Sequence, residues 1–252
     1  MSATVSISSR DIDAVIFDMD GVVTRTATVH AAAWKQLFDE YLKERERRGE
    51  GSHRPFEIGT DYRQYVDGKP RYDGVQSFLA SRGISLPFGQ PADLPDRETV
   101  CGLGNRKDAY FQRQLSEQGA EAFQSTVGLV RALRARGVKV GVFSASRNAE
   151  EVLLAAGVAD LFQVKVDGLD AERLGLRGKP DPAVLLETVR RLGVLPDRAA
   201  VVEDAGAGVQ AARAGCFRLI IGVNRSGEPG ALIASGGDVE VADLSEVILA
   251  DA

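Results

Sequence analysis

Six side chains that could take part in one chemical reaction stand at the ends of apolar runs or in a loop. They carry carboxylate, hydroxyl or ammonium groups and are Asp18, Asp20, Ser144, Lys179, Glu203 and Asp204. Two carboxylates one residue apart, as in Asp18 and Asp20, repel each other and are costly to remove from water. A buried segment that ends in such a pair therefore predicts a positive group close to it.

Each of these residue types has a function in phosphoryl transfer. An aspartate can attack phosphorus and carry an aspartyl-phosphate. A second carboxyl two residues away can pass protons to and from an alcohol oxygen. A hydroxyl and an ammonium group can hold the equatorial phosphoryl oxygens, over which the transition-state charge spreads. Carboxylates from two strands can bind Mg2+, which prefers oxygen ligands. Together these types favour Mg2+-dependent phosphoryl transfer.

The elements that must position these side chains follow from hydrophobic patterning. Val- and Ile-rich runs that do not alternate with polar residues predict buried parallel strands at 14–17, 138–144, 163–166, 199–203, 218–223 and 239–242. Helical patterns lie between them at 125–137, 148–157 and 181–193. Asn148 and Pro182 are the start signals of the second and third of these helices. This alternation predicts a doubly wound α/β fold with a parallel sheet, whose ligands gather at the carboxyl ends of the strands.

The alternation of strands and helices stops between about residues 26 and 120. Only helical patterns occur there, at 28–48, 73–83 and 104–119, and polar or Gly- and Pro-containing stretches separate them at 49–61 and 85–98. We therefore expect an α/β core domain made of residues 1–25 and 121–252, with a helical cap domain inserted at residues 26–120.

Four short motifs occur in the order that is typical of the haloacid dehalogenase (HAD) superfamily. "DMDGVVT" resembles the first motif of that superfamily, "FSAS" the second, "GKPDP" the third and "VVEDAGAGVQAARAG" the fourth. The helical insert after the first motif is similar to a C1-type cap. The resemblance covers essentially the whole chain and implies a HAD-like Rossmannoid core.

Within the superfamily, the sequence most resembles the β-phosphoglucomutase subfamily. The segments that carry this resemblance are "FDMDGVVTRTATVHAAAWK", "SASRN", "DGKPRYDG" and "NRKD". It implies that Asp18 is the nucleophile and a metal ligand. Asp20 is implied as the acid/base, with its backbone carbonyl on the metal. Asp204 is implied as a direct ligand, Glu203 as either a ligand or a group that supports one, and Ser144 and Lys179 as the groups that hold the transferring phosphoryl group.

The same resemblance implies residues that contact the substrate or form the hinge of the cap. These are Thr26, His30, Trp34, Arg71, Lys107, Ser146, Arg147 and Asn148. A purely structural role stays open for His30, which shares a helix face with Trp34 because four residues separate them. Packing is the competing explanation for Trp34, and ordinary surface charge is the competing explanation for Arg71 and Lys107.

The chain also departs from the mutase pattern. Arg25 stands where the mutases usually have an acidic residue, and Asp67 replaces an expected basic residue before the "GKPR" turn. The cap has additional residues around 43–61 and 84–98. These departures concern the cap and therefore bear on the substrate more than on the chemistry.

Three functions are compatible with these residues. The first is a β-phosphoglucomutase, which moves phosphate between C1 and C6 of glucose through a bisphosphate. The second is a sugar-phosphate phosphatase, in which water attacks the aspartyl-phosphate. The third is a non-catalytic binding module on the same fold, which the complete set of carboxylates, hydroxyl and lysine disfavours. We expect Mg2+ as the cofactor and a small phosphorylated sugar as the substrate.

One motif suggests a different cofactor. "GAGVQA" at 206–211 follows a predicted strand and resembles a dinucleotide-binding fingerprint. It stands directly after Glu203 and Asp204, and no convincing ribose-binding acid lies on a following strand. We therefore interpret its glycines as allowing a helix to pack closely beside the metal site.

Composition restricts the remaining possibilities. The 252 residues carry a net charge of −5, which argues against a general nucleic-acid binder. The chain has only two cysteines, Cys101 and Cys216, which favours a reducing cytoplasm over a disulfide framework. No apolar run approaches the roughly 20 residues that span a bilayer, and the first residues do not resemble a secretory signal. We expect a cytoplasmic enzyme that binds no membrane and is a monomer or a weak homo-oligomer.

Overall fold

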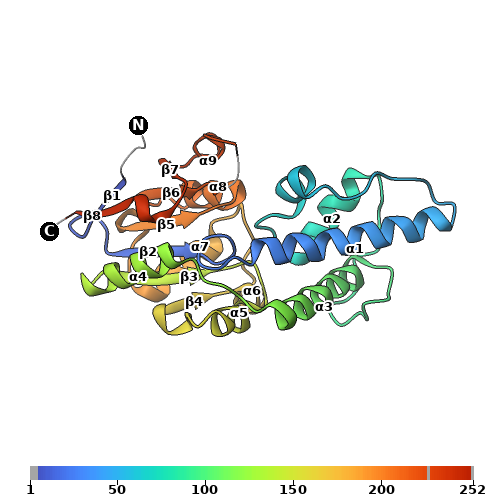
Figure 1. Cartoon of the computed structure of the whole chain (residues 1–252), viewed down its shortest axis with the longest axis horizontal. Coiled ribbons are helices and arrows are strands. Elements are labelled where there is room, and N and C mark those ends of the chain that lie inside the picture. The colour runs from blue at the N-terminus through green and yellow to red at the C-terminus, as the bar shows by residue number, and fades with distance from the viewer. Residues whose placement is uncertain (1–4, 226–227, 251–252) are drawn as a thin grey trace. The chain divides into compact units, whose positions relative to one another are not determined.

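The computed structural model describes residues 5–225 and 228–250. Contacts divide the chain into two compact units, which are described separately (Figure 1). Unit 1 comprises Met1–Arg25 together with Ala120–Ala252, and unit 2 comprises Thr26–Gly119.

Unit 1 contains a parallel sheet that, in the described part of the chain, has six strands. They are β2 (Ala14–Asp18), β3 (Lys139–Phe143), β4 (Val164–Val166), β5 (Ala199–Glu203), β6 (Leu219–Val223) and β7 (Val239–Val241). Their order in the sheet is β4-β3-β2-β5-β6-β7, so β2 lies between β3 and β5 (Figure 1). All six strands lie at the expected places, and the prediction of a doubly wound parallel sheet is confirmed.

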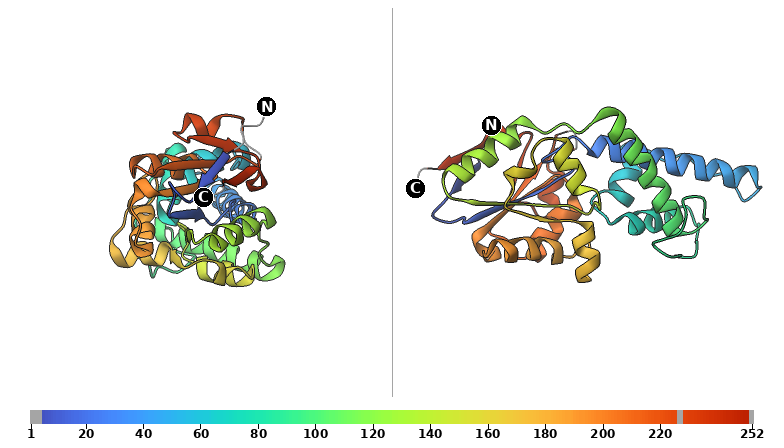
Figure 2. Two further views of the ribbon diagram at one scale, coloured as in Figure 1. Left: turned by 90° about the vertical axis from the view of Figure 1, so that its left-hand side faces the viewer. Right: turned by 90° about the horizontal axis from the view of Figure 1, so that it is seen from below.

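Helices cover both faces of this sheet. The helices of unit 1 are α4 (Gln124–Ala135), α5 (Ala149–Ala155), α6 (Gly168–Leu174), α7 (Ala183–Leu192), α8 (Gly206–Ala214) and α9 (Ala231–Ala234). Successive strand residues point to opposite faces, and Ile16 and Val201 share a core with Leu185 of α7 and Val209 of α8. The right-hand view of Figure 2 shows α4 and α7 on opposite sides of the sheet.

The register of the sheet aligns the ends of its three inner strands. Phe17 pairs with Val142 of β3 and Val202 of β5, and Asp18 pairs with Phe143. The residues that follow these pairs, Ser144 and Glu203, therefore reach the same edge of the sheet as Asp18. The strand order changes direction at β2 and β5, where open α/β sheets bind their ligands.

A second, smaller sheet was not expected from the sequence. It pairs β1 (Val5–Ser8) in parallel with β8 (Val247–Ala250). The segment "VSIS" alternates apolar and polar residues and is only four residues long, so it lacked the continuous apolar run used to predict the other strands. Short 3-10 turns complete unit 1 at η2 (Ala159–Leu161), η3 (Pro196–Arg198) and η4 (Leu244–Glu246).

Unit 2 is helical in its described elements. These are α1 (Ala27–Arg47), the π-helix η1 (Ile58–Val66), α2 (Arg71–Ser81) and α3 (Val100–Gln118). The rings of Trp34, Phe38, Phe56 and Phe78 pack together in its core, with 3.9 Å between the ring centroids of Phe38 and Phe78. The sequence did not predict η1, because part of it lies in the polar stretch 49–61.

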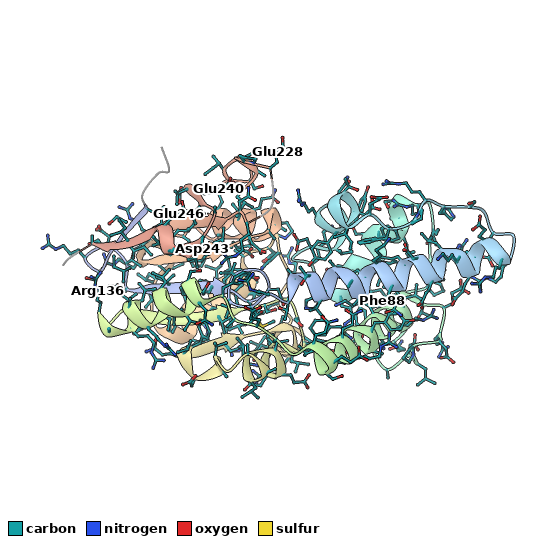
Figure 3. The ribbon with its side chains drawn as sticks, viewed as in Figure 1. Phe88, Arg136, Glu228, Glu240, Asp243 and Glu246 are labelled. Carbon is teal, nitrogen blue, oxygen red and sulfur yellow. The ribbon has the colours of Figure 1, made fainter. Side chains whose placement is uncertain are left out.

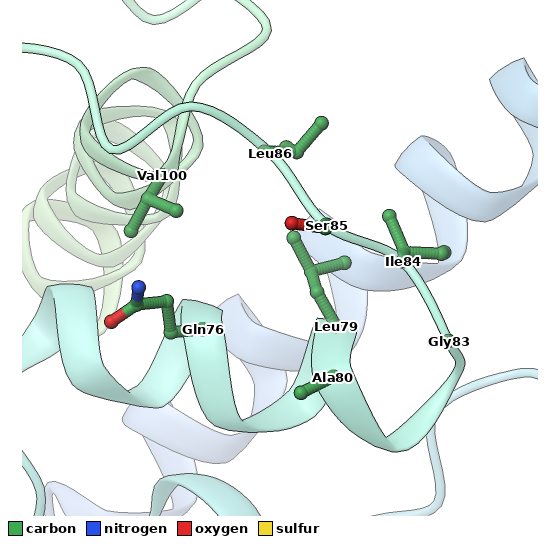
Figure 4. A pocket seen from close by; sticks show the side chains of 8 residues that line it. All are labelled: Gln76, Leu79, Ala80, Gly83, Ile84, Ser85, Leu86 and Val100. Carbon is green, nitrogen blue, oxygen red and sulfur yellow. The ribbon is translucent and has the colours of Figure 1, made fainter.

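A pocket of about 270 Å3 lies in unit 2 between α2 and the segment that follows it (Figure 4). Leu79, Ile84, Leu86 and Val100 contribute apolar side chains to its lining, and no lining residue is charged. This pocket is not where the residues with predicted chemistry lie. Among the described residues, no helix combines the length and the apolar character needed to cross a membrane.

Candidate active site

Three carboxylates meet at the carboxyl edge of the sheet in unit 1. Asp18 is the last residue of β2, Glu203 is the last residue of β5, and Asp204 follows it. One oxygen from each carboxylate lies within 4.8 Å of one oxygen from each of the others. Asp18 and Glu203 are buried, with exposed fractions of 5% and 0%. Burial of this much negative charge requires nearby cations.

Lys179 supplies one positive charge at this edge. Its Nζ lies 2.5 Å from Asp18 Oδ1, and the same nitrogen forms an ion pair with Glu203 Oε1. Lys179 belongs to the loop between α6 and α7 and is 6% exposed. Its ammonium group lies 4.8 Å from the ring centroid of Phe143. The positive group that the paired aspartates predicted is therefore present.

The electrostatics of the cluster are not balanced by this lysine alone. Burial raises the pKa of Asp18 well above its ordinary value, and the neighbouring charges of Glu203 and Asp20 act in the same direction. Burial lowers the pKa of Lys179, but Asp18 and Glu203 raise it by more, so that the pKa lies above its usual range and the lysine stays protonated. One ammonium group thus serves several carboxylates, and the cluster has an excess of negative charge.

Glu203 is held in place through both of its oxygens. Oε1 contacts Lys179, and Oε2 accepts hydrogen bonds of 2.9 Å from the backbone N–H groups of Asp204 and Ala205. A Cβ added to Gly208 would stand 1.7 Å from Glu203 Oε1. Gly208 of "GAGVQA" thus lets α8 lie against this carboxylate, which agrees with the interpretation of this motif as a site of close helix packing.

Ser144 joins the other catalytic candidates through Asp20. Its hydroxyl donates a hydrogen bond of 3.3 Å to Asp20 Oδ2 and accepts one of 3.0 Å from the Ser146 backbone N–H. Ser144 is 2% exposed, and its own N–H donates to the carbonyl of Val166 in β4. The structure therefore brings all six residues that the sequence singled out to one edge of the sheet.

Gly21 contributes to the geometry although the sequence analysis did not single it out. Its φ is +87°, and an added Cβ would stand 1.7 Å from Asp204 Oδ2. Only glycine combines this backbone conformation with so close an approach. Its position directly after the two aspartates of the first motif was the available signal.

The donor set suits a hard divalent cation. Every side-chain donor in the cluster of Asp18, Glu203 and Asp204 is a carboxylate oxygen, and Mg2+ and Ca2+ prefer oxygen ligands. The excess of negative charge around Lys179 favours the same conclusion. The residues present therefore fit a metal ion.

Ser146, Arg147 and Asn148 lie between β3 and α5 in unit 1. The Asn148 N–H donates a hydrogen bond of 3.2 Å to Ser146 Oγ. Asn148 occupies the N-cap position of α5, but its side chain makes no cap hydrogen bond there, which differs from the expected capping role. The guanidinium group of Arg147 lies 3.4 Å from the carboxylate of Glu172.

His30, Trp34 and Lys107 form a cluster within unit 2. Lys107 is 4% exposed, its Nζ lies 2.6 Å from His30 Nδ1, and it stands 5.2 Å from the ring centroid of Trp34. The ring of His30 stacks on Phe111 with 4.0 Å between centroids. Because an ammonium group only donates hydrogen bonds, a protonated Lys107 requires His30 Nδ1 to be the acceptor.

The other predicted residues of unit 2 have separate contacts. Arg71 begins α2 and forms an ion pair of 2.7 Å with Asp108. Thr26 is buried at the N-cap position of α1, and its carbonyl accepts the His30 N–H at 2.9 Å.

The two departures from the mutase pattern also have defined surroundings. Arg25 lies in unit 1, where its Nε is 3.4 Å from the carboxylate of Glu121 and its guanidinium carbon is 4.3 Å from the ring centroid of Phe123. Asp67 follows η1, and its N–H donates to the Tyr62 carbonyl at 2.9 Å. The Arg25 side chain therefore contacts residues of unit 1, and the Asp67 backbone closes the end of η1.

Comparison with known proteins identifies the family. The family model for haloacid dehalogenase-like hydrolases matches residues 12–215, which include all six residues at the sheet edge. The chain belongs to this family. Membership agrees with the HAD resemblance inferred from the four motifs, and it makes the protein an enzyme of phosphotransferase or phosphatase type.

Several individual proteins are similar over nearly the whole chain. A β-phosphoglucomutase of Mycobacterium bovis is 44% identical over 240 residues, which cover 94% of this chain and 92% of that protein. A phosphorylated carbohydrates phosphatase of Thermotoga maritima is 25% identical and covers 94% and 97%. A crystal structure of a β-phosphoglucomutase from Clostridium difficile matches the fold with a TM-score of 0.69 and 22% identity, covering 93% and 92% of the chains.

Proposed function

We propose that this protein is a Mg2+-dependent β-phosphoglucomutase that interconverts β-glucose 1-phosphate and glucose 6-phosphate through the 1,6-bisphosphate. The observation that carries the phosphoryl-transfer chemistry is the position of buried Lys179 between Asp18 and Glu203, together with the hydrogen bond between Ser144 and Asp20. The 44% identity to a β-phosphoglucomutase supports the choice of reaction.

The proposed reaction begins with attack of Asp18 on the phosphorus of the C1 phosphate of the 1,6-bisphosphate, so that glucose 6-phosphate departs. The new bond joins an Asp18 oxygen to phosphorus, and the bond from phosphorus to the departing alcohol oxygen breaks. The Asp20 carboxyl group gives its proton to that oxygen. In the second half-reaction the Asp20 carboxylate takes the proton from the C6 hydroxyl of β-glucose 1-phosphate, whose oxygen attacks the phosphorus. This step forms the 1,6-bisphosphate again and restores free Asp18.

Lys179 and Ser144 hold the transferring group in this proposal. The ammonium group already lies 2.5 Å from Asp18, and the hydroxyl lies 3.3 Å from Asp20. Both can donate hydrogen bonds to phosphoryl oxygens, whose negative charge spreads in the transition state.

The metal would be held by the carboxylates of Asp18 and Asp204 and by the backbone carbonyl of Asp20. Glu203 is the supporting residue, because Lys179 and two backbone N–H groups already occupy its oxygens. When bound, Mg2+ would offset the repulsion between the carboxylates and the phosphate.

We extend the proposal to the residues that select the substrate. They are Thr26, His30, Trp34, Arg71, Lys107, Ser146, Arg147 and Asn148, and residues 26–120 form the cap domain. The supporting observation is that Lys107 keeps a charged group among aromatic rings and His30, an arrangement suited to an anionic ligand. Cys101 and Cys216 are free thiols, which supports a cytoplasmic location.

A sugar-phosphate phosphatase is the second candidate, because a phosphorylated carbohydrates phosphatase is also similar along the chain. Water would then take the place of the second sugar hydroxyl. The same residues of unit 1 serve both reactions, so their geometry does not separate the two products.

Product analysis separates the two candidates. The protein is incubated with β-glucose 1-phosphate, Mg2+ and a trace of β-glucose 1,6-bisphosphate, and the products are followed by 31P NMR. The mutase predicts glucose 6-phosphate as the main product. Release of inorganic phosphate at the same rate as substrate loss would instead identify the phosphatase.

A further inference from the structure

Arg225 connects three distant segments of unit 1. Its Nε donates a hydrogen bond of 3.2 Å to the carbonyl of Gly21, and its Nη1 lies 2.5 Å from Asp243 Oδ2. Its guanidinium carbon lies 3.6 Å from the ring centroid of Phe123. With 21% of its side chain exposed, Arg225 is mostly buried, and its partners come from the loop after β2, the start of α4 and the turn after β7.

The acidic partner of Arg225 is itself held firmly. Asp243, which is labelled in Figure 3, occupies the N-cap position of η4. Its Oδ1 accepts the Ser245 N–H at 3.0 Å, and its Oδ2 accepts the Ser125 hydroxyl at 2.8 Å. The guanidinium group of Arg225 is therefore paired with a carboxylate that two other hydrogen bonds hold in place.

The Nε group of Arg225, on the side away from Asp243, contacts the loop that carries Asp20. The Gly21 N–H donates to the Thr24 carbonyl at 2.8 Å. Because a trans peptide is planar, this bond also sets the direction of the Asp20 carbonyl, which points away from that N–H. Arg225 holds the next peptide group through the Gly21 carbonyl. The peptide groups on both sides of Gly21, whose φ is +87°, are thus restrained. Without these hydrogen bonds the backbone of a glycine has more conformational freedom than that of any other residue type.

We propose that Arg225 is a positioning residue that holds the loop between Met19 and Thr24 so that Asp20 meets the departing alcohol oxygen. Arg225 touches neither of the reacting carboxylates in the described contacts and acts through the Gly21 carbonyl. The inference rests on the proposed role of Asp20 as the acid/base. It assigns a function to a residue of the segment after β6, where the sequence analysis identified none.

The dependence of the rate on the leaving group distinguishes positioning from general structural support. A sugar oxygen is a poor leaving group and needs the proton of Asp20, whereas p-nitrophenolate departs as an anion without it. Displacement of Asp20 should therefore slow transfer from a sugar phosphate and leave transfer from p-nitrophenyl phosphate nearly unchanged. Loss of Lys179 or Ser144, which hold the phosphoryl group itself, should slow both.

The test compares Arg225→Met, Arg225→Lys and the control Arg198→Met in the full chain. Arg198 also joins a carboxylate to a carbonyl, those of Asp13 and Arg10, but at the amino ends of β2 and β5. Arg225→Met should lower kcat for β-glucose 1-phosphate by about tenfold or more, since small misplacements of catalytic groups have effects of this size. The rate of the first p-nitrophenolate release, measured in a single turnover before the aspartyl-phosphate breaks down, should change by less than about twofold. The lysine variant should recover part of the loss with the sugar phosphate, and Arg198→Met should change neither rate.

Hydrogen exchange of the peptide spanning residues 19–24 provides a readout that is independent of activity. Arg225→Met should accelerate exchange there, while exchange in β5 stays as in the parent protein. Equal losses with both esters, unchanged rates, or unchanged exchange in 19–24 would each overturn the inference. If the parent protein acts on neither ester, the proposed function fails, and the exchange comparison alone decides whether Arg225 positions the loop.

Discussion

The two lysines buried in the two units have opposite surroundings. Lys179 in unit 1 faces the carboxylates of Asp18 and Glu203 at the edge of a parallel sheet. The contacts of Lys107 in unit 2 include the ring nitrogen of His30 and the rings of Trp34 and Phe111. The surroundings of Lys179 are rich in negative charge, whereas those of Lys107 are aromatic and come from helices.

Under the proposed function, this difference would separate the residues that carry out the chemistry from those that select the substrate. A carboxylate-rich edge attracts a metal ion and can supply a nucleophile and an acid/base, and these serve any phosphate ester. A cation among aromatic side chains offers attraction for one anionic ligand but no group that attacks phosphorus. Changes in unit 1 should therefore affect every substrate, and changes at Lys107 should affect only the substrates that it recognises.

Replacing the proposed nucleophile should have the largest effect. Asp18→Asn keeps the size of the side chain but removes the attacking carboxylate, so turnover of both β-glucose 1-phosphate and p-nitrophenyl phosphate should be lost. Circular dichroism should show that the fold is retained. Measurable turnover of either ester by the folded variant would show that another group attacks.

Removing the metal should also abolish activity with both esters. Chelation followed by addition of Mg2+ should restore it. Because Mg2+ would bind the folded protein alone, Mg2+ at 100 times its dissociation constant should stabilise the parent by about 2.7 kcal/mol. This stabilisation, followed as a shift in Tm, should shrink in Asp18→Asn. A chelated enzyme that stays fully active would remove the metal from the mechanism.

The same substitution at the two lysines tests the comparison directly. Lys179→Met leaves Asp18 and Glu203 buried without their shared cation, so unfolding should become easier by about 3–5 kcal/mol and activity with both esters should fall sharply. Chemical denaturation and initial rates measure the two effects. Stability equal to that of the parent protein would show that the cluster does not depend on this charge.

Lys107→Met should have a smaller and more selective effect. The apolar side chain suits the surrounding rings, and the main loss is the hydrogen bond to His30, worth about 1 kcal/mol. The value of kcat/KM for β-glucose 1-phosphate should fall by about 10- to 100-fold if the ammonium group binds a phosphate, with p-nitrophenyl phosphate little affected. An equal fall in kcat/KM for both esters would contradict the proposal that Lys107 selects the substrate while unit 1 carries out the chemistry.

The parts of the fold predicted from sequence are those with strong local signals. The strand at 199–203 was located correctly because "AAVVE" is a continuous apolar run that ends in a carboxylate, and its parallel register places Glu203 beside Asp18. The pairing of β1 with β8 joins residues near opposite ends of the chain, and no local pattern indicates such a partner. Likewise η1 begins inside a polar stretch and is held by tertiary contacts, such as the ion pair between Asp61 and Arg82.

The site likewise contains residues that local motifs reveal and residues whose roles depend on distant contacts. Asp18, Ser144 and Lys179 could be found from motifs because strand ends and one loop fix their places. The sequence left the role of Glu203 open, and the partners of its two oxygens support the proposal that it assists the metal ligands. Arg225 was not found because its partners, the Gly21 carbonyl, Phe123 and Asp243, come from segments that are distant in sequence.

The central claim is that Asp18 carries the phosphoryl group, and mass spectrometry of a trapped intermediate tests it most directly. The protein is mixed with Mg2+ and β-glucose 1,6-bisphosphate, quenched in acid within milliseconds and digested. Our account predicts one added phosphoryl group on the peptide that contains Asp18, and none in Asp18→Asn. A phosphoryl group on Ser144 or on any other residue, with Asp18 unmodified during turnover, would contradict it.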